Sequence, residues 1–173
     1  MLRSILGSGI LLALVFGFIP SLYSQSGSVQ LQIVSASSID FTADQSSFTL
    51  NFSDFKSGST TNTAEVNYSV LANNVVRSDD VVLARLDEPF PGIAFQAQFG
   101  SYAKKGGNSH LVESQSGFVA IGSDDIGLAD KVLDEGDGKM LDGSFVIRYQ
   151  AKALEDQAAG EHSRTLTVTV ADT

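Results

Sequence analysis

The residues best placed to do chemistry lie in an acidic, glycine-containing loop over residues 130–142. Asp134, Asp137 and Asp142 carry hard carboxylate oxygens on a chain that two glycines allow to bend, and Ca²⁺ requires ligands of this kind. The spacing departs from the helix–loop–helix calcium motif, because glycines stand where that motif has Asp or Asn. The three aspartates are therefore candidate metal ligands, although we favour the interpretation of a solvated hairpin loop in an acidic protein.

Other reactive residue types are sparse and form no recognisable catalytic pattern. His110 and His162 are the only histidines; they lack the spacing of a zinc site, and each lies in a polar segment that predicts an exposed turn. The chain has no Cys and no G-x-S-x-G nucleophile motif. We therefore expect a protein that is not an enzyme and holds no cofactor, with Ca²⁺ as the one candidate ion.

Basic and aromatic residues offer little to a ligand either. Lys104 and Lys105 form a basic spot that we expect at a hairpin tip. Sugar-binding surfaces often use exposed aromatic rings, but Trp is absent, and among the tyrosines behind residue 24 only Tyr102, beside Gly100, is predicted to be free. Glycan binding is disfavoured by this composition but stays open.

The overall charge excludes some classes of partner. The chain has 20 Asp and Glu residues against 11 Lys and Arg residues, and its formal net charge is −9. Nucleic acids and anionic membrane surfaces attract basic patches, so we expect neither as a partner. Because Cys is absent, stability must come from apolar burial and sheet hydrogen bonds.

Residues 1–24 have the pattern of a secretory signal peptide. Arg3 provides a positive start, an uncharged apolar run follows, and small residues then lead to cleavage after Ser24 or Ser26. The alternative is an N-terminal membrane anchor, but the run is shorter than the ~20 residues that a spanning helix needs. We expect a helical signal peptide, a single domain over 25–173, and a secreted, periplasmic or cell-surface location without membrane contact after cleavage.

Behind that segment, apolar and polar residues alternate along most of the chain, as they do in strands with one buried face. Short strands separated by turn-rich segments predict an all-β fold, an antiparallel two-sheet Ig-like sandwich of seven to nine strands, with a jelly roll as the alternative. The predicted core consists of Leu31, Ile33, Leu50, Phe52, Val66, Tyr68, Val70, Val82, Phe95, Phe145, Ile147, Tyr149, Leu166 and Val168.

Three segments allow more than one interpretation. Residues 124–135 carry apolar residues at helical spacing and predict one or two helical turns, whereas residues 153–159 lie between two strong strands and predict a loop. The strand over residues 26–34 is expected to be an ordinary first strand. If it were free, it would suit pairing with the sheet edge of another chain.

The last thirty residues resemble a known group of exported proteins. Residues 143–173 read as a strand, a spacer, Ala159-Gly160, a polar turn and a final alternating Thr/Val strand. This order resembles the last hairpin of the spore coat U and fimbrial subunit families, which are exported, pilin-like sandwiches that assemble by lending a strand to a neighbour. Those families commonly carry a Cys pair, which this chain lacks.

The sequence thus leads us to expect an exported structural or interaction domain, in the form of a pilin-like subunit of a surface assembly that binds protein partners or its own copies by strand pairing. The alternative is an extracellular module that binds a glycan or calcium.

Overall fold

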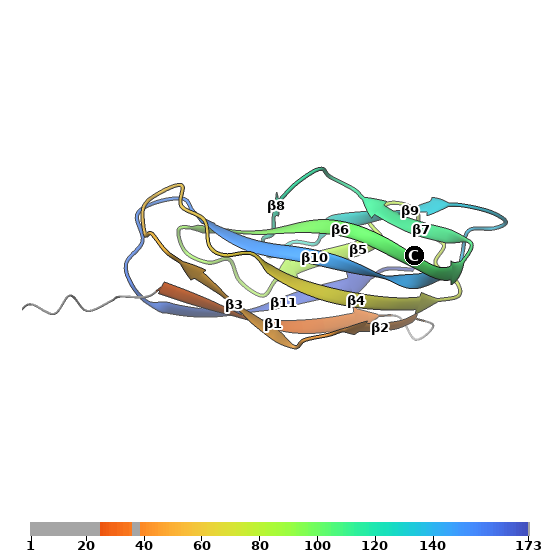
Figure 1. Cartoon of the computed structure of the whole chain (residues 1–173), viewed down its shortest axis with the longest axis horizontal. Helices are drawn as coiled ribbons and strands as arrows, with labels where there is room; N and C mark the ends of the chain where they lie inside the picture. Colours follow the sequence, from red (N-terminus) through yellow and green to blue (C-terminus); the bar gives the residue numbers. More distant parts are fainter. Residues whose placement is uncertain (1–24, 36–38, 173) are drawn as a thin grey trace, which may run out of the picture.

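The computed structural model describes residues 25–35 and 39–172, and within them the chain folds as two β-sheets packed face to face (Figure 1). The predicted all-β two-sheet sandwich is confirmed. The strands are β1 (Gln25–Ser35), β2 (Ile39–Ala43), β3 (Ser47–Phe52), β4 (Ala64–Ala72), β5 (Val82–Leu86), β6 (Ile93–Gly107), β7 (Ser109–Glu113), β8 (Val119–Ala120), β9 (Ile126–Leu133), β10 (Leu141–Ala153) and β11 (Glu161–Val170).

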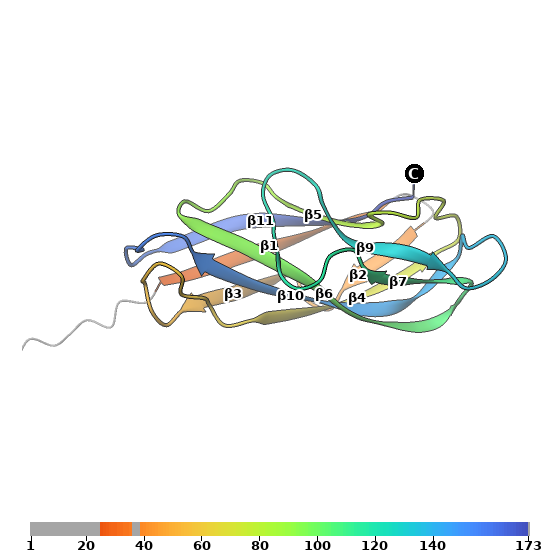
Figure 2. The same cartoon turned by 90° about the horizontal axis from the view of Figure 1, so that it is seen from above.

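The sheets have six and five strands, in the orders β3-β1-β11-β5-β9-β7 and β2-β4-β10-β6-β8. Eleven strands exceed the seven to nine expected: β2 and β7 have only five residues each, and β9 lies where helical turns were expected. Figures 1 and 2 show an elongated sandwich in which β1 begins at one end and the β9–β10 connection lies at the other. In this described part, no helix is long and apolar enough to cross a membrane.

The first strand is an internal strand of its own sheet. β1 pairs antiparallel with β3 over Gln25–Gln30 and parallel with β11 over Ser26–Ser35, which makes β1–β11 the one parallel pair among the described strands. The expectation of an ordinary first strand is confirmed. The expected signal peptide, residues 1–24, lies outside the described residues.

The helical turns expected over residues 124–135 are wrong. Ile126–Leu133 is a strand, β9, which pairs with both β5 and β7. Leu128 and Ala129 are buried between the sheets, so pairing with distant strands outweighs a local helical pattern. Residues 153–159 connect β10 to β11 as a loop, as expected.

Aromatic rings fill the middle of the core. Of the fourteen predicted core residues, twelve are buried, and Leu31 and Ile33 are partly buried against them. Tyr68 on β4 and Tyr149 on β10 are both fully buried, and their hydroxyl oxygens lie 2.7 Å apart. Burial raises the pKa of both hydroxyls well above the usual range, so both stay neutral and one donates a hydrogen bond to the other.

We expect the Tyr149→Phe variant to lower the free energy of unfolding by about 1–3 kcal/mol, because it leaves the buried Tyr68 hydroxyl without a partner. The double variant Tyr68→Phe/Tyr149→Phe removes both hydroxyls and should recover most of that loss. Urea unfolding of the single and double variants measures the difference. A double variant as unstable as the sum of the two single variants would contradict the pairing.

Candidate functional site

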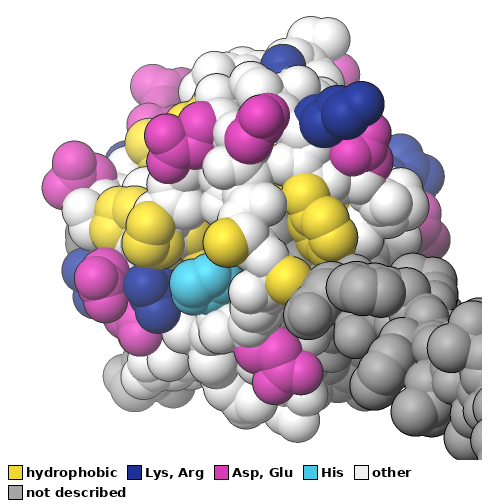
Figure 3. Space-filling view, turned by 90° about the vertical axis from the view of Figure 1, so that its left-hand side faces the viewer, with side chains coloured by type: hydrophobic (Ala, Val, Ile, Leu, Met, Phe, Trp, Pro, Cys, Tyr) yellow, Lys and Arg dark blue, Asp and Glu magenta, His cyan; other side chains and the backbone are white. Residues whose placement is uncertain are grey.

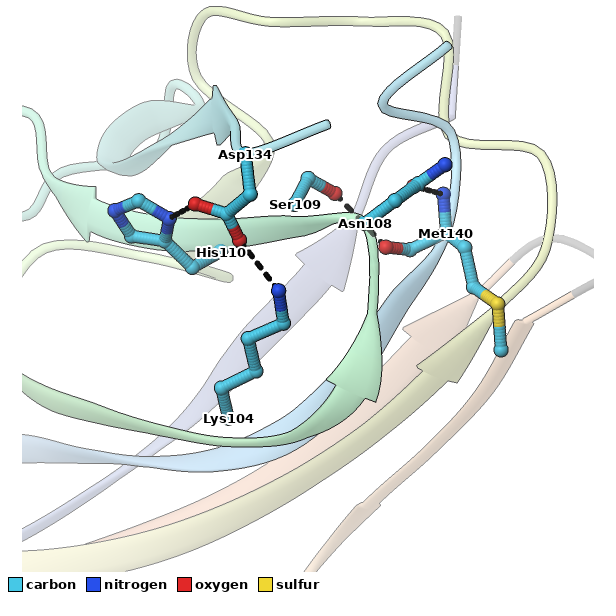
Figure 4. A network of polar contacts seen from close by, with 6 residues as sticks. All are labelled: Lys104, Asn108, Ser109, His110, Asp134 and Met140. Atoms are coloured by element: carbon cyan, nitrogen blue, oxygen red, sulfur yellow. Dashed lines mark hydrogen bonds and ion pairs between the residues drawn. The ribbon is translucent and has the colours of Figure 1, made fainter. Parts of the chain in front are cut away.

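The acidic loop contributes to a polar cluster at the end of the sandwich where β9 leads into β10 (Figure 4). Asp134 follows β9 and lies between a lysine and a histidine side chain. Its Oδ2 is 2.6 Å from Lys104 Nζ on β6, and its Oδ1 is 2.6 Å from His110 Nδ1 on β7. Because β6 belongs to one sheet and β7 and β9 to the other, the Lys104–Asp134 pair ties the two sheets together.

Asn108, at the corner between β6 and β7, holds the loop in place. Its side-chain amide nitrogen donates to Asp137 Oδ1 at 2.9 Å, and its amide oxygen accepts from the Met140 N–H at 2.8 Å. Its carbonyl oxygen accepts from the Asp134 N–H at 3.0 Å. Gly107 precedes it with φ +80° and passes so close to the Met140 carbonyl that a Cβ would lie 2.5 Å from that oxygen, so the corner requires glycine.

The electrostatics of the cluster keep its carboxylates ionised. The hydrogen bond from Lys104, and after it the contact with His110, lowers the pKa of Asp134 below its usual range. The amide of Asn108 does the same for the pKa of Asp137. Both carboxylates are exposed, so the cluster is a solvated network that fixes the loop.

The three candidate metal ligands do not share a site. Asp134 contacts Lys104 and His110, Asp137 contacts Asn108, and Asp142 lies on β10 opposite Gly106. In the described ranges, no three Asp, Glu or His side chains form a group that could hold a metal ion. The geometry supports a structural role for Asp134 and Asp137.

Several expectations about single residues are wrong. His110 and His162 lie within β7 and β11 and are half-buried, because strand pairing continues through segments that look like turns. Lys104 and Lys105 lie inside β6, before the corner at Asn108. Tyr102 is not free: it is half-buried against Gly143, and burial raises the pKa of its hydroxyl to about 12.

The opposite end of the sandwich has a small apolar slot that encloses about 20 Å³, enough for about one water molecule. It lies between the two sheets, and its lining is almost entirely apolar. Figure 3 shows this end, with hydrophobic side chains near its middle and acidic side chains around them. The slot is lined by Ser26, Gly27, Val29, Leu50, Phe52, Thr61, Phe90, Ile93, Phe95, Ala151 and His162.

A gap in the alternating pattern explains the slot. Inward positions of β1 carry Val29, Leu31 and Ile33, and the same period places residue 27 inward as well, where the chain has glycine. A Cβ at Gly27 would have its nearest neighbours, two backbone oxygens, 4.0 Å away. The sheet therefore has room for a side chain that the sequence does not supply.

Phe90 and His162 form one side of the slot, and Arg164 packs against Phe90 from outside the lining. The Arg164 guanidinium lies over the Phe90 ring, 5.3 Å from its centroid, and the His162 ring meets Phe90 edge-on at 6.5 Å. Arg164 Nη2 is 3.7 Å from Glu88, while its buried Nε has no hydrogen-bond partner among the described residues. Sequence reasoning missed this site because its residues come from separate strands and loops; the glycine at position 27 was the available signal.

Four exposed apolar side chains lie at the end that carries the polar cluster. Leu133 is 58% exposed and Val76 59% exposed, and Val132 and Met140 are also exposed. The Val75 N–H donates to the Lys139 carbonyl at 2.9 Å, which places the β4–β5 loop beside the β9–β10 connection. We call this set, Val76, Val132, Leu133 and Met140, the apolar tip.

Comparison with protein-family models and with curated proteins finds no match to this chain. The geometry offers a polar cluster that fixes the β9–β10 connection and exposed apolar side chains at the two ends.

We expect Asp134→Asn to lower the melting temperature by on the order of a degree or two at neutral pH, because the amide cannot replace the charge between Lys104 and His110. The folded-state pKa of Asp134 is lowered, so this contribution is present above the usual Asp pKa of about 3.9 and is lost as the pH falls through the lower folded-state value. Thermal melts across this range measure it.

Asp124→Asn is the matched control, since Asp124 is exposed and has no polar partner in the described part of the chain. An Asp134→Asn effect that is the same at pH 2 as at pH 7, within about one degree, or an equal effect of the control, would contradict the role of the ion pair.

Proposed function

We propose that this chain is an exported, non-enzymatic subunit of an extracytoplasmic assembly, and that it associates through the ends of its sandwich. The observation that carries this proposal is the pair of apolar surfaces at opposite ends of one elongated domain. Exposed apolar groups that gather in one place are typical of interaction sites on soluble proteins.

The distribution of polar groups supports the same proposal. The side chains with the most reactive chemistry, Asp134, Lys104 and His110, are bonded to one another. The outer face of the six-stranded sheet carries hydroxyl and amide side chains such as Gln30, Thr165 and Thr167, which water satisfies without a partner. Contact with another protein would therefore bury more apolar surface at the ends than on this outer face.

The pattern of residues 1–24 supports the exported location, and an assembly outside the cytoplasm agrees with the resemblance of residues 143–173 to fimbrial subunits. In those families a strand passes between neighbours. Here β1 already has partners on both sides, so we propose association by packing of side chains at the ends rather than by exchange of β1.

Expression of the full-length gene in a host with a secretory pathway tests this proposal. We expect N-terminal sequencing of the exported protein to begin at Gln25 or Gly27, and light scattering to show a mass that rises with protein concentration. An uncleaved chain that stays in the cytoplasm would overturn export. A constant monomer mass at every concentration would overturn the assembly.

A further inference from the structure

We propose that the outer face of the five-stranded sheet binds a neutral glycan in a polar groove across β2, β4, β10 and β6. We call this the face groove and define it by Thr42, Ser69, Ser144, Ala103 and Lys105. The inference goes beyond the proposed function, because it assigns a ligand to a surface that association through the ends of the sandwich leaves exposed.

A row of small side chains forms the floor of the face groove. Thr42 on β2 lies opposite Ser69 on β4. Ser69 in turn lies opposite Ser144 on β10, which lies opposite Ala103 on β6. These side chains point to solvent, because the residues that alternate with them, such as Val70, are buried. Neighbouring strands lie about 4.8 Å apart, so a row across four strands spans about 14 Å and is long enough for a short oligosaccharide.

Larger side chains on both sides of this row make it a groove. Leu71 and Asp142 form the next cross-strand pair on one side. Asn67 and Val146 form the next pair on the other side. Two adjoining hollows, of about 440 Å³ and about 130 Å³, lie along the row, and Lys105 lines both of them. The hollows are therefore continuous, and an extended ligand has space to lie across the strands.

The polar side chains of the face groove are available to a ligand. Within the described part of the chain, the Ser69 and Ser144 hydroxyls and the Lys105 ammonium form no hydrogen bond or ion pair. The Asp142 carboxylate, which lines the smaller hollow with Lys105, forms none with the described residues either. A ligand can therefore bind these groups without breaking a contact inside the protein.

The rest of the same sheet face is different, because its long side chains pair with each other. Arg148 Nε is 2.8 Å from Glu65 Oε1. The Gln150 side-chain nitrogen donates to Gln96 Oε1 at 2.9 Å. Small side chains and unpaired polar groups thus coincide in the face groove, which distinguishes it from the solvated surface around it.

The kinds of group in the face groove fit a ligand rich in hydroxyls. A carboxylate accepts hydrogen bonds, an ammonium donates them, and a serine hydroxyl does both. Sugar hydroxyls also donate and accept, so one glycan can satisfy all three kinds of group. Asp40 and Asp142 line the groove with Lys105 as their counter-charge, and this excess of negative charge disfavours acidic glycans and phosphates.

Binding in the face groove rests on hydrogen bonds rather than on aromatic stacking. Tyr68 and Phe145, the aromatic residues along the groove, are buried in the core, so their rings do not stack on a ligand. The methyl groups of Val146 and Ala103 offer a small apolar contact to the C–H groups of a sugar. Because these hydrogen bonds compete with water, we expect a dissociation constant on the order of millimolar.

NMR titration of the isotope-labelled exported protein tests this inference. The probes are hexasaccharides of cellulose, mannan, xylan and chitin, with hexagalacturonate as an acidic probe. We expect at least one neutral probe to shift the amide resonances of groove residues such as Ser69, Ser144 and Lys105. Hexagalacturonate should bind more weakly, because its carboxylates meet those of the groove.

Two variants and two matched controls locate the site. Lys105→Met removes the ammonium and Ser144→Gln fills the larger hollow, and each should weaken binding about tenfold. Lys152→Met is the first control, because Lys152 is exposed on β10 ten residues beyond Asp142. Thr167→Gln is the second control, because Thr167 lies on β11 in the other sheet. Circular dichroism checks that each variant is folded.

The outcomes decide this inference separately from the proposed function. It is overturned if no neutral probe binds up to millimolar concentrations, or if both groove variants bind as well as wild type. An equal loss in either control, or tighter binding of hexagalacturonate than of every neutral probe, overturns it as well. None of these results bears on association through the ends, which light scattering measures without any glycan present.

Discussion

The packing of aromatic rings between the sheets is the interaction on which the rest of this structure depends. The chain has no disulfide, so the relative position of the sheets follows from what fills the space between them. Two rows of rings do so, Phe41, Tyr68, Phe145 and Phe99 in the first and Phe48, Tyr149, Phe95 and Phe90 in the second. The hydrogen bond between Tyr68 and Tyr149 joins the rows, and because it is directional and buried it favours one arrangement of the rings in a way that apolar contacts do not.

The same packing explains why one end of the sandwich is open. The second row of rings stops at Phe90, and beyond it the inward positions of β11 carry His162 and Arg164 instead of apolar residues. Gly27 contributes no side chain from β1, so nothing completes the layer. The slot is thus the place where the aromatic core ends before the strands do.

Prediction from the sequence succeeded where a local pattern decides the structure. Alternation with period two places inward residues such as Val66 and Phe145 correctly, because every second residue of a strand lies on the same face and needs no distant partner to be recognised. It failed for residues 124–135, whose strand depends on pairing with β5 and β7, far away in the sequence. For the polar cluster, the sequence showed the acidic loop but not its partners. Lys104 and Asp134 are thirty residues apart and meet because the chain turns at Asn108, and no known motif spacing predicts that turn.

The arrangement of the strands also determines how the two ends relate to each other. β10 pairs with β4 on one side and with β6 on the other along most of its length, so the slot and the apolar tip belong to one rigid unit. The orientation of one end relative to the other is therefore fixed. The outer face around Gln30, Thr165 and Thr167 is polar and stays hydrated, so lateral contacts bury little apolar surface. Among the described residues, the most exposed large apolar side chains, such as Val76, Leu133 and Leu154, lie in the connections at the ends of the strands or next to them, so the strands themselves present little apolar surface to solvent.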